Sequence, residues 1–167
     1  MMNLIKIIIF AVLIIVGKAQ SNDNQTPLDR IAFYEAMKSG NLTVIENQLK
    51  EVSQINDQSL DAFRGALLMR KADLLNQLKS KISTFKLGHD LLEAMILKDK
   101  SNVEFRFLRL MIQENVPKVI KYQSHIEEDK TIILNSFSSL PSWFKKILKD
   151  YGKSSNQLGE LQEDKYK

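Results

Sequence analysis

Histidine is the residue type most often used for proton transfer and metal binding, and the chain contains two, His89 and His125. They are far apart in the sequence, and neither belongs to a short spacing of metal ligands. His89 falls on the apolar edge of a predicted helix, so we expect a structural, partly exposed residue, with neighbouring acids such as Glu93 on a solvated face. The chain has no cysteine, which excludes thiolate chemistry and disulfides. The sequence therefore predicts no metal ion, no cofactor and no local catalytic motif, although a catalytic set could assemble from distant residues.

Three charged residues lie on helix faces that are otherwise apolar. Glu104 and Glu114 point into the apolar arc of a helix predicted over residues 102–115, and Arg70 projects from the apolar face of an earlier helix. One interpretation is a buried charged site that binds a polar ligand. The other is local satisfaction, with Glu104 closing a capping box with Ser101 and Arg70 close to the end of its helix. We favour the second interpretation, because helix ends supply such partners locally.

A stripe of lysines runs along the last predicted helix and consists of Lys145, Lys146 and Lys149. Such a stripe is a candidate contact surface for an anionic lipid or polysaccharide. Trp143 and Tyr151 occupy the opposite arc of the same helix, which we expect to be buried. The stripe is therefore interpreted first as a solvated face and second as a contact surface.

The helix predicted over residues 102–115 is the element around which the others must pack. At about 100° per residue, its apolar side chains cover more than half of the helical wheel, and Arg106, Arg109 and Gln113 form the clear polar stripe. A helix with so little polar surface cannot lie on the outside of a domain. We therefore place it at the centre of an all-α domain, with Phe107 and Leu108 buried on different sides of it.

Six further helices are predicted around this central one. Capping patterns, prolines and glycines place the seven helix starts near residues 27, 43, 59, 80, 102, 124 and 140. The helix over residues 80–98 should face the core with Ile82 and Phe85, and Gly65 and Gly88 should allow neighbouring helices to approach closely. The pattern predicts an all-α fold of about seven helices, as an irregular antiparallel array of helical hairpins or as a bundle.

The N-terminal residues 1–19 differ from this helical region. They combine Lys6, an unbroken apolar run from Ile7 to Val16, and small residues at positions 17 and 19, which is typical of a signal peptide cleaved after Ala19. The apolar run is shorter than the ~20 residues that cross a membrane, so an uncleaved anchor is the lesser alternative. We expect export to the periplasm or the extracellular space, and no transmembrane span in the mature chain.

The remainder of the 167-residue chain divides into three parts. Residues 20–26 form a polar linker and residues 27–152 a single helical domain. Residues 153–167 are polar and have no apolar stripe, so we expect a disordered tail without contacts to the core.

Two stretches resemble known helical proteins. The segment from Gly88 to Met95 and its turn at residues 99–102 resemble the second helix and exit turn of a tetratricopeptide repeat, with Leu92 at the large position and Lys100 in place of the turn proline. More broadly, residues 62–72 and 103–115 are similar to segments of uncharacterised secreted helical proteins of Bacteroidota-type bacteria, a similarity that spans residues 59–151. This resemblance implies an envelope or secreted location, and it carries no activity with it.

The function expected from these observations is that of a secreted or periplasmic helical module. Its role would be structural or protein-binding, and its partner another envelope or secreted protein. Two alternatives are an enzyme whose site is built from dispersed residues and an envelope-surface module that docks through the lysine stripe. Nucleic acid is not expected as a partner, because the net charge of +4 is weak, and Lys6 and Lys18 lie in the segment to be removed.

Overall fold

The computed structural model describes residues 27–159 and 161, and this part of the chain forms seven α-helices and no strand. The predicted signal peptide and linker, residues 1–26, lie outside the described residues. The all-α fold with about seven helices is confirmed. The helices are α1 Arg30–Lys38, α2 Leu42–Gln54, α3 Asp61–Leu74, α4 Leu78–Lys98, α5 Val103–Asn115, α6 Ile126–Ser136 and α7 Ser142–Gly152. Single turns of 3-10 helix lie in three connections, η1 Gln58–Leu60, η2 Lys118–Ile120 and η3 Phe137–Ser139.

Short polar side chains fix where several helices begin. Asp29, Asn41 and Asn102 cap α1, α2 and α5, because their side-chain oxygens accept hydrogen bonds from backbone amides two or three residues further on. The capping box predicted from Ser101 is wrong. The neighbouring Asn102 accepts a hydrogen bond from the Phe105 amide instead, and α6 begins at Ile126 without a side-chain cap.

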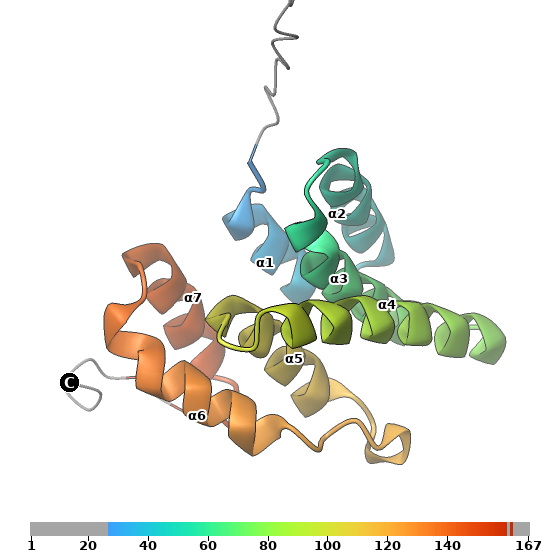
Figure 1. Ribbon diagram of the computed structural model, residues 1–167. Coiled ribbons are helices and arrows are strands. Elements are labelled where there is room, and N and C mark those ends of the chain that lie inside the picture. The colour runs from blue at the N-terminus through green and yellow to red at the C-terminus, as the bar shows by residue number, and fades with distance from the viewer. Residues whose placement is uncertain (1–26, 160, 162–167) are drawn as a thin grey trace, which may run out of the picture.

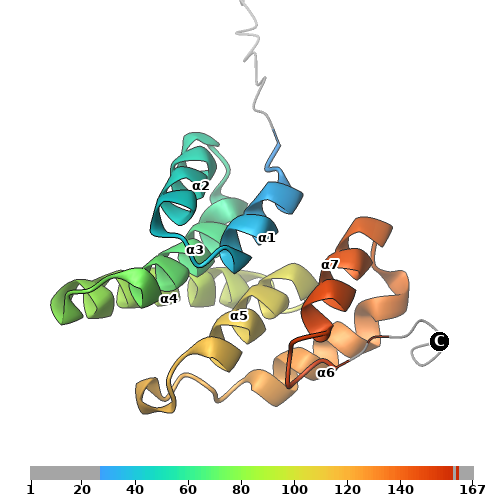
Figure 2. The same ribbon diagram turned by 180° about the vertical axis from the view of Figure 1, so that it is seen from behind.

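Helix α5 lies between the N-terminal helices α1–α4 and the C-terminal pair α6 and α7 (Figure 2). Phe107 and Leu108 are both fully buried, which confirms the central position of this helix. The polar stripe does not face water, because Arg106, Arg109 and Gln113 are buried too. Helix α6 covers this side of α5 and supplies carboxylates to both arginines.

Helices α3 and α4 cross at two glycines, as the sequence predicted. A Cβ atom on Gly65 would lie 2.6 Å from the carbonyl oxygen of Gly88, and one on Gly88 would lie 2.5 Å from the carbonyl oxygen of Gly65. No larger residue fits at either position without moving backbone. The crossing leaves α4 as a long helix whose N-terminal half extends beyond the rest of the fold (Figure 1).

The segment after α7 does not behave as the predicted tail where the structure describes it. Leu158 and Leu161 are buried members of the core cluster. Glu114 of α5 accepts hydrogen bonds from the Ser155 hydroxyl and the Asn156 amide, at 2.8 and 2.5 Å. The two leucines of this segment pack on the core, and the Glu114 carboxylate of α5 binds its backbone and a serine. The segment is therefore held in place although it has no apolar stripe. Residues 160 and 162–167 lie outside the described part of the chain.

Candidate functional site: a groove beside helix α4

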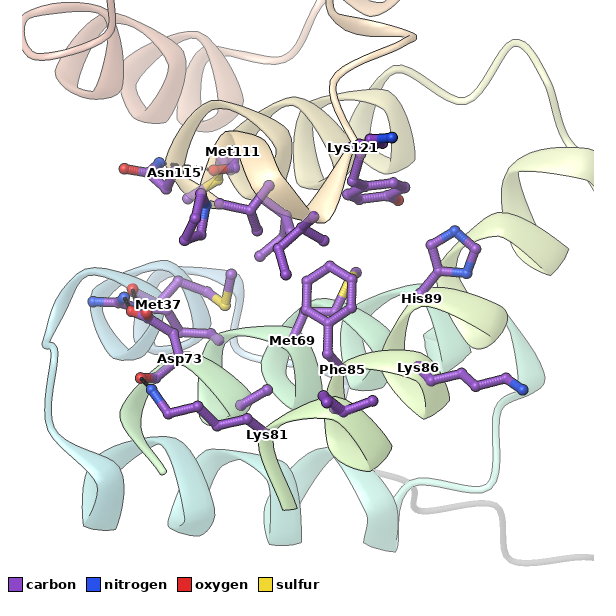
Figure 3. Close-up of a pocket in the computed structure, with 18 of the residues that line it drawn as sticks. Met37, Met69, Asp73, Lys81, Phe85, Lys86, His89, Met111, Asn115 and Lys121 are labelled. Carbon is purple, nitrogen blue, oxygen red and sulfur yellow. Dashed lines mark hydrogen bonds and ion pairs between the residues drawn. The ribbon is translucent and has the colours of Figure 1, made fainter. Parts of the chain in front are cut away.

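An open groove of about 880 Å³ runs between α4 and the connection from α5 to α6. The ends of α1, α3 and α5 form its floor, and the last turn of α7 with Ser154 also lines it. Figure 3 shows Phe85 projecting from α4 between the two walls, with Lys121 on the opposite wall. The volume of the groove lies within the range of small-molecule and cofactor sites.

Flexible apolar side chains form the floor. Met37 of α1, Met69 of α3 and Met111 of α5 all line the groove and are buried beneath its opening, together with Ile112. Methionine is unbranched and polarisable, so it adjusts to surfaces of different shape. A floor of this kind suits a ligand whose apolar surface is irregular.

One wall is an apolar stripe on the N-terminal half of α4. Leu78, Ile82, Phe85 and His89 fall within about 60° of one another at 100° per residue, and all four line the groove. The prediction that Ile82 faces the core is wrong, since 59% of Ile82 is exposed. Helix α3 packs on the Gly88 side of α4, which leaves this stripe without a covering helix.

The opposite wall and the inner end come from η2 and the residues after it. Ile120 lines the wall, and Tyr122 closes the end with edge-on ring contacts to Phe85 and His89, at centroid distances of 5.8 and 4.9 Å. The Tyr122 hydroxyl donates to Glu93 Oε1 at 2.5 Å. Burial, followed by this hydrogen bond and the charge of Glu93, raises the pKa of Tyr122, so it remains a neutral donor. The tyrosine therefore connects the groove to the interior of the fold.

That interior connection is a cluster of buried charges. Asp129 of α6 is fully buried and accepts hydrogen bonds from Arg109 at 2.7 Å to each carboxylate oxygen and from Arg106 at 3.1 Å. Arg109 also pairs with Glu93 at 2.8 Å, and Arg106 with Glu128 at 2.8 Å. Burial opposes the charge of Arg109, but the hydrogen bonds and charges of Asp129 and Glu93 outweigh it and raise its pKa.

This cluster joins α4, α5 and α6 and has a structural role. The expectation that Glu93 lies on a solvated face is wrong, because Arg109 and Tyr122 both bind it. The two arginines satisfy the carboxylate of Asp129 completely, so the cluster offers no free charge to a ligand. Among residues 27–159 and 161, no group of three or more histidines and carboxylates is arranged to hold a metal ion.

Two of the residues singled out from the sequence meet at the groove. His89 stands at its inner end, half-exposed, and its Nδ1 is 3.1 Å from Asp90. Arg70 lines the other side, where its Nε donates to the Met37 carbonyl at 3.0 Å and its guanidinium pairs with Asp73 at 2.7 Å. Arg70 therefore joins α3 to the end of α1 and forms part of the groove's edge.

Glu104 has a partner far away in the sequence instead of the local one expected. Both of its oxygens accept from Arg30 Nε at 3.1 Å, and one also accepts from the Tyr34 hydroxyl at 3.2 Å. Burial raises the pKa of Glu104, and the charge of Arg30 opposes that shift without cancelling it. The Arg30 guanidinium also lies over the rings of Phe63 and Trp143. These contacts fasten α1 to α5 and do not form an accessible site.

Glu114 likewise has a structural role. It accepts from the Tyr151 hydroxyl at 2.8 Å in addition to the segment after α7. Burial, followed by the hydrogen bond and charge of Glu114, raises the pKa of Tyr151 above its usual value. Glu104 therefore joins one end of α5 to α1, and Glu114 joins the other end to α7 and the segment after it.

The lysine stripe lies on the opposite side of α7 from the core. Lys145 and Lys149 each place their ammonium 5.9 Å from the centre of the Phe137 ring, and Lys146 is exposed. They border a shallow hollow with Ser142, Asp150 and Lys153. The prediction that Trp143 is buried is wrong, because it is partly exposed and covers Phe144 and Arg30 only in part. The arrangement is that of a solvated face whose lysine stems cover one aromatic ring.

The groove itself is not predicted by the sequence pattern. Periodicity alone assigns its apolar stripe on α4 to the core and does not distinguish the floor methionines from ordinary core residues. The lysines on both edges of that stripe, Lys81 and Lys86, give no warning, because charged residues commonly border an apolar stripe that faces a core.

The described helices include none that is both long enough and apolar enough to cross a membrane. Comparison of the chain with protein-family models, with curated proteins and with solved structures gives no match.

Proposed function

We propose that this chain is an exported binding module whose groove takes up an amphipathic helical segment of another protein. The observation that carries the proposal is the exposed apolar stripe on α4, with Leu78 and Ile82 largely open to solvent above a methionine floor. Exposing such a surface costs free energy unless a partner covers it, and contiguous exposed apolar surface often marks an interaction site.

The dimensions of the groove favour a helix as the occupant. The wall from Leu78 to His89 is about 16 Å long at 1.5 Å per residue, which corresponds to three turns of a bound helix. Recognition of an apolar helix face in a groove relies on anchors spaced three or four residues apart. Methionine floors such as that formed by Met37, Met69 and Met111 accommodate anchors of different shape.

A second copy of the chain is a poor occupant. Lys81, Lys86 and Lys121 border the groove, so two copies facing each other here would bring like charges together. Like-charge contacts across an interface disfavour association. The partner is therefore a different protein.

The test is binding of a synthetic helical peptide to the purified protein and to two variants. The probe is a fluorescein-labelled peptide of about 14 residues with leucine at every third or fourth position and glutamine elsewhere, and a scrambled peptide is the control. Ile82→Glu places a charge on the groove wall. Leu87→Glu is the matched control, because Leu87 is 55% exposed on the same helix but lies outside the groove.

Both substitutions should leave the fold intact, since exposed positions tolerate change within about 0.5 kcal/mol. Complete burial of an isoleucine stabilises by about 1.5–3 kcal/mol, and Ile82 has just over half of that still to gain on binding. Loss of this burial, together with desolvation of the new carboxylate under the bound peptide, should weaken peptide binding at least about tenfold in fluorescence anisotropy. Equal binding by Ile82→Glu and Leu87→Glu, or equal binding of the scrambled peptide, would overturn the proposal.

A further inference from the structure

We infer that the bound helix is acidic along its flanks and that Lys81, Lys86 and Lys121 recognise its carboxylates. This inference rests on the proposed function and adds the chemistry of the partner. Three independent observations support it, namely the charges that remain free at the groove, their positions around the apolar stripe, and the nature of the N-terminus of α4.

The carboxylates at the groove are already engaged. Asp73 pairs with Arg70 at 2.7 Å, and Asp150 pairs with Lys153 at 2.8 Å. Neither is free to attract a basic partner. The acids that line the described groove are therefore neutralised within the protein.

The lysines at the groove retain their charge. Lys86 and Lys121 are exposed, and neither side chain forms an ion pair or hydrogen bond with the residues that the structure describes. Lys81 donates to the backbone carbonyl of Asp73 at 2.9 Å, a contact that holds the ammonium in place without neutralising it. A net positive charge therefore remains at the edges of the groove.

These three lysines border the apolar stripe on both sides. At 100° per residue, Lys81 and Lys86 lie about 60–80° to either side of the line through Leu78 and His89. Lys121 extends from the opposite wall (Figure 3). A helix that lays its apolar face on the stripe would direct its two flanks toward these cations, so acids on the flanks would pair with them.

The start of α4 adds positive potential at the outer end of the groove. Gln77 provides no side-chain cap, the first turn contains no acid, and Lys79 and Lys81 occupy it instead. A helix N-terminus carries a partial positive charge, so lysines there are placed unfavourably in the free protein. An acidic partner would relieve that repulsion, whereas a basic partner would increase it.

The experiment compares three labelled peptides that share one leucine face and carry glutamate, glutamine or lysine on both flanks. Each is titrated against the parent protein, the double variant Lys86→Glu/Lys121→Glu, and the control Lys50→Glu. Lys50 is exposed on α2, outside the groove lining, and it forms no ion pair with any described residue. Sodium oleate serves as a competitor, because its carboxylate and alkyl chain share the chemistry of an acidic helix.

The expected result is that the glutamate peptide binds the parent at least about tenfold more tightly than the lysine peptide at low salt. Each exposed pair contributes modestly, and three pairs act together. The preference should shrink at about 0.5 M salt, where charges are screened beyond a few ångströms. The double variant should reverse the order of the peptides, while Lys50→Glu should not change it.

Two kinds of failure are distinguishable. If all three peptides bind the parent equally and Ile82→Glu still abolishes binding, the acidic specificity is refuted and the proposed function stands. If no peptide binds above its scrambled form, both are refuted. Displacement of the peptides by micromolar oleate, with oleate binding that itself depends on Lys86 and Lys121, would replace the acidic helix by an anionic lipid and overturn the inference.

Discussion

Replacing the buried carboxylate of Asp129 should destabilise the fold more than any other single charge removal. In Asp129→Asn one carboxylate oxygen becomes an amide group, which would direct N–H donors at the guanidinium groups of Arg106 or Arg109. The native oxygens accept hydrogen bonds of 2.7, 2.7 and 3.1 Å from these arginines, and Asp129 has an exposed fraction of 0%. Removing one partner of a buried ion pair costs about 3–5 kcal/mol, because the remaining charge stays buried without compensation. A domain of this size is stable by about 5–15 kcal/mol, so the loss is a large share of the total.

The matched control is Glu46→Gln, which breaks an ion pair of similar length on the surface. Glu46 lies 2.8 Å from Lys71 with 47% of its side chain exposed. Solvent screening limits such a pair to about 0–1 kcal/mol. Urea unfolding, monitored by circular dichroism, would give the free energy of unfolding of both variants. An unchanged dependence of this free energy on urea concentration would indicate an unchanged unfolded state. If the two variants lose the same stability, the cluster around Asp129 does not hold α5 and α6 together, and burial of the charges does not set their contribution.

Three other perturbations test separate parts of the fold. Burial raises the pKa of Glu104 above that of the unfolded chain, so its contribution to stability should fall as pH rises from about 4 to 7. Relative to the parent, Glu104→Gln should therefore be more stable at pH 7 than at pH 4 in urea unfolding, and the opposite trend would contradict the assignment. Removing the C-terminal segment that carries Leu158 and Leu161 should cost about 3–6 kcal/mol, and an unchanged thermal midpoint would show that they do not pack on the core. The buried amide of Gln113 has no hydrogen-bond partner among the described residues, so Gln113→Met should raise the free energy of unfolding by about 1–3 kcal/mol in urea unfolding. A variant less stable than the parent would indicate that the amide has a partner.

Local sequence signals were sufficient for the elements of the fold. Gly40 ends the first hairpin helix with a positive φ of 60°, and Gly65 and Gly88 mark the crossing of α3 and α4. The apolar circumference of α5 indicated its central position, because its polar stripe is too narrow for a helix on the outside of a domain. Each of these signals is carried by one residue or one helix and its local pattern, which is why they could be predicted.

The candidate site could not be predicted in the same way, because it depends on which faces find a partner. The pattern around Arg106 and Arg109 indicates a solvated stripe, since their partner Asp129 lies about twenty residues later on another helix. The pattern around Ile82 indicates a core face, since a stripe on α4 looks the same whether a helix covers it or not. The sequence shows which side chains share a face. Tertiary packing decides whether that face is buried. The sequence pattern indicates a buried Ile82 and a solvated Arg106, whereas in the structure Ile82 is exposed and Arg106 is buried.

The glycine crossing has a consequence for how the groove responds to a ligand. Contact of the backbones at Gly65 and Gly88 braces the α4 wall against α3, so this wall cannot move without separating two helices. The facing wall is the single turn η2, which ends at Lys121 in a left-handed conformation with a φ of 55° and has no helix behind it. The groove therefore has one rigid wall, formed by α4, and one movable wall, formed by η2. Backbone amides near Gly88 should exchange with solvent slowly whether or not a helix is bound, whereas those of η2 should slow only when the groove is filled.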